Sequence, residues 1–86
     1  MDVLARVEAE LARYRHPLIS MNAHSSTGDG GVDVLLQLKD PSVSAHTYRL
    51  HLTVREIENP RFSWAFQKLL YDSLHDYIIE LFTDRP

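Results

Sequence analysis

The feature that most constrains the fold of this chain is the alternation of side chains in residues 47–55. The even positions are apolar, namely Tyr48, Leu50, Leu52 and Val54. The odd positions are polar, namely Thr47, Arg49, His51, Thr53 and Arg55. Strict alternation is typical of a β-strand with one buried and one exposed face. Because the polar face carries two arginines and a histidine, it is also the first candidate for a functional site.

Two further strands are predicted before this one. Residues 18–25 and residues 32–39 also alternate between apolar and polar side chains. The stretch between them, SSTGDGG over residues 25–31, is typical of a tight turn, so the two strands should form a hairpin. A second turn that starts at Asp40 leads to residues 47–55. Short connections between neighbouring strands therefore predict a three-stranded antiparallel meander.

Two helices are predicted to flank the strands. Residues 2–14 show the spacing of an amphipathic helix, and Asp2 can cap its start. Asn59 and Pro60 suit the cap and first position of a long helix that continues until near Pro86. The predicted fold class is α+β, a two-layer sandwich in which the N- and C-terminal helices cover one face of the meander (α-β-β-β-α). The length of 86 residues predicts one domain, 1–86.

The last helix carries more apolar surface than one sheet-facing stripe requires. One stripe contains Phe62, Phe66, Leu69, Leu70, Tyr77 and Leu81. A second stripe, nearly opposite the start of the first, contains Trp64, Tyr71, Ile78 and Phe82. A surplus of this kind on a small domain often marks a partner surface. We therefore predict that the second stripe forms an oligomer interface, with burial by the first helix as the alternative.

Polar residues of all three strands are expected to gather on the exposed sheet face. Pairing around the first turn sets Asn22 opposite Leu35 and His24 opposite Asp33. Pairing around the second turn is predicted to set Gln37 opposite Arg49, Leu35 opposite His51 and Asp33 opposite Thr53. The predicted partner-binding surface consists of Asn22, His24, Gln37, Arg49, His51 and Arg55. Arginine, imidazole and amide donors suit an anion or a polar chain, and an ordinary solvated face is the alternative.

Signals for catalysis and cofactors are weak. The chain has no cysteine, which excludes disulfides, thiolate nucleophiles and thiolate zinc sites. Neither a GxSxG nor an HExxH motif is present, so we expect no enzyme activity, no cofactor and no small-molecule substrate. His24, Asp33 and His51 have metal-ligand chemistry and could converge on adjacent strands. They leave a metal site as the last alternative.

Nucleic-acid binding is disfavoured by the net charge of −3, because phosphate binding usually needs a surplus of lysine and arginine. The predicted element order nevertheless resembles that of the double-stranded RNA-binding domain, whose sheet is also covered on one side. That family uses a basic cluster at the start of its last helix, where residues 60–68 of this chain offer Arg61 and Lys68. RNA binding across the sheet face, through Asn22, Gln37, Arg49 and Arg55, is kept as an alternative function.

The leading hypothesis from sequence is a small non-enzymatic protein-interaction module whose partner is a protein or a second copy of itself. The first 15 residues carry charges every few positions, unlike a signal peptide, and no apolar run approaches the length of a membrane span. We therefore expect a cytoplasmic protein without a membrane partner, and a homodimer is the preferred assembly.

Overall fold

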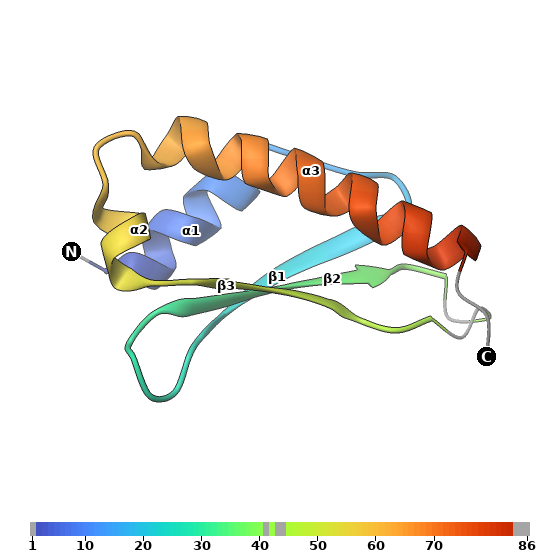
Figure 1. Ribbon diagram of the computed structural model, residues 1–86, viewed down its shortest axis with the longest axis horizontal. Coiled ribbons are helices and arrows are strands. Elements are labelled where there is room, and N and C mark those ends of the chain that lie inside the picture. Colours follow the sequence, from blue (N-terminus) through green and yellow to red (C-terminus); the bar gives the residue numbers. More distant parts are fainter. Residues whose placement is uncertain (1, 41, 43–44, 84–86) are drawn as a thin grey trace.

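The computed structural model describes residues 2–40, 42 and 45–83. Its elements in chain order are α1 (Val3–Leu11), β1 (Ile19–Ser25), β2 (Val32–Leu38), β3 (Tyr48–Leu52), α2 (Val54–Glu58) and α3 (Phe62–Thr83). The strands form one antiparallel sheet in the order β1-β2-β3. Figure 1 shows the helices together on one side of this sheet. The predicted α+β fold with a three-stranded meander is confirmed, and the short helix α2 is an addition to it.

The hydrophobic core lies between the sheet and the helices. It contains Val7, Leu11, Ile19, Val32, Val34, Leu36, Leu52, Ile57, Phe62, Phe66, Leu70, Leu74 and Tyr77, all of them buried. Full burial of one large apolar side chain stabilises a fold by about 1.5–3 kcal/mol. The inward positions of β2 and the first stripe of α3 therefore supply much of the driving force for folding.

Helix α1 begins as predicted and ends earlier than predicted. The Asp2 side chain accepts hydrogen bonds from the N–H groups of Leu4 and Ala5, at 3.1 and 3.3 Å. The helix ends at Leu11, because the next residues form a tighter turn in which the Tyr14 N–H donates to the Leu11 carbonyl at 3.1 Å. A proline disfavours helical geometry in the residue before it, so Pro17 opposes continuation of the helix into β1.

Strand β3 ends at Leu52, and the prediction that it continues to residue 55 is wrong. Thr53 and Glu56 form a capping box that starts α2 instead. Glu56 accepts from the Thr53 N–H at 2.8 Å, and Thr53 Oγ1 accepts from the Glu56 N–H at 3.2 Å. These bonds satisfy N–H groups that a helix start leaves without partners. Arg55 therefore lies on α2 and is not part of the sheet face.

The first predicted register is confirmed, and the second is wrong by two residues. His24 pairs with Asp33, as expected. Asp33 also lies opposite His51, and Leu35 lies opposite Arg49. A shift of two residues keeps every side chain on its own face of the sheet, so hydrophobic patterning does not distinguish the two registers. The observed register brings His51 and Arg49 to Asp33, and these charged contacts favour it.

Helix α3 is the longest element, with 22 residues. It begins at Phe62, two residues after the predicted start, while the Asn59 side chain accepts from the Arg61 N–H at 2.8 Å. Among the helices in the described part of the chain, none combines the length and apolarity that crossing a bilayer requires.

Candidate functional site

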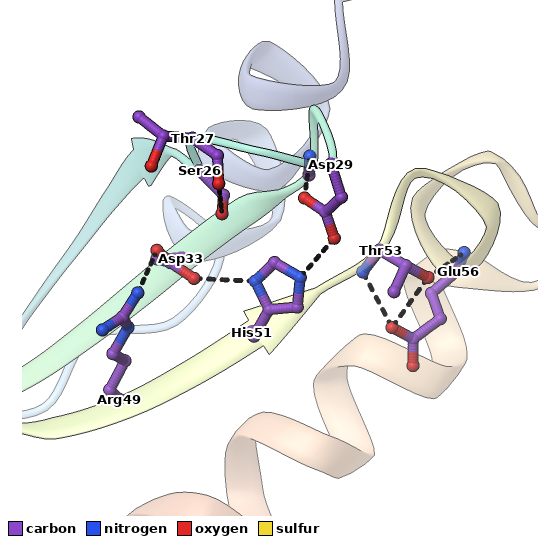
Figure 2. A network of polar contacts seen from close by, with 9 residues as sticks. Ser26, Thr27, Asp29, Asp33, Arg49, His51, Thr53 and Glu56 are labelled. Atoms are coloured by element: carbon purple, nitrogen blue, oxygen red, sulfur yellow. Dashed lines mark hydrogen bonds and ion pairs between the residues drawn. The ribbon is translucent and has the colours of Figure 1, made fainter.

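A polar network lies on the exposed sheet face around His51 of β3 (Figure 2). His51 Nδ1 lies 2.8 Å from Asp33 Oδ1, and His51 Nε2 lies 2.7 Å from Asp29 Oδ2. The Arg49 guanidinium donates to the second oxygen of Asp33 at 2.8 Å. The second oxygen of Asp29 accepts from the Gly31 N–H, also at 2.8 Å. The network thus connects β2, β3 and the turn between β1 and β2.

The charges of this network balance one another. Hydrogen bonds to Asp33 and Asp29 raise the pKa of His51, because both bonds favour the protonated ring. The Gly31 N–H and His51 lower the pKa of Asp29. His51 and Arg49 lower the pKa of Asp33. Arg49 and the protonated form of His51 therefore face two carboxylates within the domain itself.

This arrangement changes the interpretation of the predicted partner-binding surface. Arg49 and His51 lie together, as expected, but they donate to carboxylates of the same chain. Arg55, the other arginine of the RNA alternative, lies on α2. Electrostatic binding of phosphates requires cations that are not already neutralised. The sheet face therefore offers an external anion less than its sequence suggests.

The remaining residues of the predicted surface extend it across β1 and β2. Asn22, His24 and Gln37 are exposed. His24 lies directly opposite Asp33 and so borders the network, while Asn22 lies opposite Leu35 and Gln37 opposite Ser20. The face is thus a polar surface that contains one internally bonded cluster.

The metal alternative gains no support from this geometry. Within residues 2–40, 42 and 45–83, no group of three or more histidine and acidic side chains is arranged to hold a metal ion. His51 has both ring nitrogens in contact with carboxylates. A histidine ligand must present an unprotonated nitrogen to the metal, which conflicts with donation from both nitrogens.

The predicted oligomer interface on α3 is divided between exposed and partly buried residues. Trp64 is 68% exposed and Tyr71 is 66% exposed, so the first helix does not bury them. Ile78 is partly buried and packs against the core. The side chain of Phe82 lies outside the described part of the structure. The Arg61 guanidinium lies 6.0 Å from the centroid of the Trp64 ring, close enough for a cation–π contact.

An apolar groove of about 290 Å³ lies where β3, α2 and α3 meet. Its lining residues are Leu52, Glu56, Asn59, Arg61, Phe62, Trp64, Ala65, Phe66 and Leu69. The core residues Leu52, Phe62 and Phe66 supply much of its apolar wall, and Leu69 is 37% exposed. The groove includes Glu56 of α2, a helix that the alternation of residues 47–55 does not predict. The spacing of Thr53 and Glu56, which is that of a capping box, is the sequence signal from which α2 could have been predicted.

Comparison of the chain with protein-family models, with curated proteins and with solved structures found no match. Its function is therefore inferred from its own geometry and chemistry.

Proposed function

We propose that the chain is a small non-enzymatic protein-interaction module that associates with a second copy through α3. The observation that carries the proposal is the exposure of Trp64, at 68%, on the edge of an apolar groove. An aromatic side chain that becomes buried removes about 150–250 Å² from water, and tryptophan is enriched among the residues that dominate binding energy.

The contact surface consists of the exposed apolar residues of α3. These are Trp64, Tyr71 and Ile79, which are 68%, 66% and 46% exposed and lie on one side of the helix at 100° per residue. We call them the α3 surface. Lys68 and Asp72 lie among them and form an ion pair at 3.2 Å.

A second copy is the partner that this surface fits. A two-fold axis makes a helix pack against its own copy, so one patch must complement itself. Lys68 and Asp72 place both signs of charge among the residues of the α3 surface. Antiparallel packing of two α3 helices therefore allows each Lys68 to face the Asp72 of the other copy. Such reciprocal pairs would set the register, while burial of Trp64 and Tyr71 would supply affinity.

The proposal is tested by sedimentation equilibrium over a wide concentration range. We expect a monomer–dimer equilibrium that Trp64→Ala weakens at least about tenfold, the loss typical of an anchor residue. Leu18→Ala is the matched control, because Leu18 is 62% exposed and precedes β1, outside the α3 surface. A chain that stays monomeric at every concentration, or an equal effect of both variants, would overturn the proposal.

A further inference from the structure

The last residue of the turn between β1 and β2 lies against the end of β3. A Cβ atom added to Gly31 would lie 2.2 Å from the carbonyl oxygen of Leu52, so the two backbones are in close contact. Within the turn, the Ser26 N–H donates to the Gly31 carbonyl at 2.9 Å. The contact between Asp29 and His51 is the side-chain link at the same place (Figure 2).

The two contacts of His51 require two ring protons. Carboxylates that are ionised only accept hydrogen bonds, so each nitrogen of His51 must donate to the oxygen it faces. The neutral imidazole has one N–H and one lone pair. After loss of one proton, a lone pair would therefore face either Asp33 or Asp29, and that contact becomes repulsive. Both contacts of His51 are therefore favourable only when the ring is an imidazolium.

The contact with Asp29 is the one that deprotonation should break. The Asp33 side chain is 13% exposed, lies opposite His51 in the β2–β3 register, and is also held by Arg49. The Asp29 side chain is 47% exposed. It lies between Gly28 and Gly30, which both adopt positive φ, a region that glycine populates without steric cost. Water can replace His51 at Asp29 without disturbing the sheet.

We propose that His51, Asp29 and Asp33 form a pH-sensitive clip that holds the turn against β3 while His51 is protonated. Loss of the proton releases the turn, and β2 and β3 stay paired. Other ionisable groups also face or border the clip. They are Arg49 on β3, His24 on β1 opposite Asp33, and Glu56 on α2, whose carboxylate binds Thr53.

The direction of the switch follows from the charges. The carboxylates of Asp33 and Asp29 raise the pKa of His51, so release occurs at higher pH than the titration of an ordinary histidine. Arginine stays protonated throughout that range, so Arg49 continues to hold Asp33 ionised and in place. His24 is the other histidine beside the clip, because it lies opposite Asp33, and the experiment must separate its effect from that of His51.

The test is an NMR titration of the whole chain that follows the His51 ring and the turn amides together. In the closed clip, the order parameters of the Asp29 and Gly30 amides should be near the rigid value of about 0.85. They should fall below about 0.6 as pH rises, with the same midpoint as the His51 ring. In Asp29→Asn, the amide oxygen can still accept from the Gly31 N–H and the amide nitrogen can donate only to an unprotonated Nε2. The turn should therefore no longer be released as His51 loses its proton, and His51 should titrate at lower pH than in the unmodified chain.

The control is His24→Gln, which removes the neighbouring histidine and should leave the response of the turn unchanged. A turn that stays rigid while His51 titrates would overturn the clip. So would a turn whose mobility follows His24 instead. Because the titration of the unmodified chain already distinguishes these results, the test does not depend on the stability of any variant.

Discussion

The hydroxyl of Tyr77 accepts a hydrogen bond from the backbone N–H of Leu38 at 3.1 Å. The same hydroxyl donates to the carbonyl oxygen of His46 at 2.7 Å. Continuing the β2–β3 register by two residues beyond Leu36 and Tyr48 sets Leu38 opposite His46. The hydroxyl of α3 therefore joins two backbone groups at the point where the ladder between the strands ends, and ties the helix to both.

Replacement of Tyr77 by phenylalanine should destabilise the domain by about 1–3 kcal/mol, because the Leu38 N–H and the His46 carbonyl lose their partner in a partly buried place. The free energy of unfolding in urea measures this loss. Tyr71→Phe is the control, since Tyr71 is 66% exposed and should change stability little. Equal effects of the two substitutions would show that the hydroxyl of Tyr77 has no structural role.

The sequence predicts the fold well wherever the periodicity of side chains reports burial. Alternation located three strands, and helical spacing located α1 and α3. The same reasoning failed at Thr53, because Val54 occupies an apolar position both in the predicted strand and at the start of α2. The capping box of Thr53 and Glu56 favours the helix over the strand. The alternation of apolar and polar side chains gives no information about capping. The hydrogen bonds of Tyr77 could not be predicted from periodicity either, since its partners are 39 and 31 residues away along the chain.

The carboxylate of Glu10 joins α1 to α3. Glu10 is 8% exposed, and its carboxylate accepts from Ser63 Oγ, from Gln67 at 2.9 Å and from Arg13 at 3.1 Å. Burial raises the pKa of Glu10, but these donors outweigh burial and place the pKa below its ordinary value. The carboxylate is therefore held in its ionised form between the two helices.

Glu10→Ala should lower the free energy of unfolding by about 1–3 kcal/mol, because Ser63, Gln67 and Arg13 lose their acceptor. Glu8→Ala is the matched control on the same helix, since Glu8 is exposed. Thermal or urea unfolding compares the two variants. If Glu10→Ala were no more damaging than Glu8→Ala, the network would contribute nothing to the packing of α1 on α3.

The candidate site on the sheet was only partly predictable. Arg49 and His51 share a face because they are two residues apart on one strand, which the sequence shows directly. Their partners depend on register, and the predicted pairing set Asp33 opposite Thr53 instead of His51. Asp29 lies in a turn, where periodicity says nothing about side-chain direction. The surface predicted to bind an anion therefore contains a cluster with its own counter-ions.

The stability of the domain should fall at both ends of the pH range. The pKa values of Asp29 and Asp33 are lowered on folding, so their contribution is present above the ordinary aspartate pKa and is lost as pH falls through the lowered values. The pKa of His51 is raised, so its contribution is present below the ordinary histidine pKa and is lost as pH rises through the raised value.

This dependence is measured as the free energy of unfolding in urea at a series of pH values. His51→Gln should remove most of the decline that occurs above the ordinary histidine pKa, while His24→Gln should retain it. If the decline persisted unchanged in His51→Gln, an ionisable group other than His51 would be its cause.

Gly31→Ala should be among the more damaging substitutions in the turn. An added Cβ would lie 2.2 Å from the Leu52 carbonyl oxygen and 3.1 Å from a carboxylate oxygen of Asp29. The first of these is backbone and cannot move aside without displacing the end of β3. Overpacking of this kind costs about 1–3 kcal/mol, and the shift should also separate Asp29 from His51.

Thr27→Ala, at an exposed position of the same turn, is the control. Urea unfolding should show a loss for Gly31→Ala alone, and the His51 pKa, followed by NMR, should fall with it. Unchanged stability and an unchanged His51 pKa would mean that the turn is not seated against Leu52 in solution.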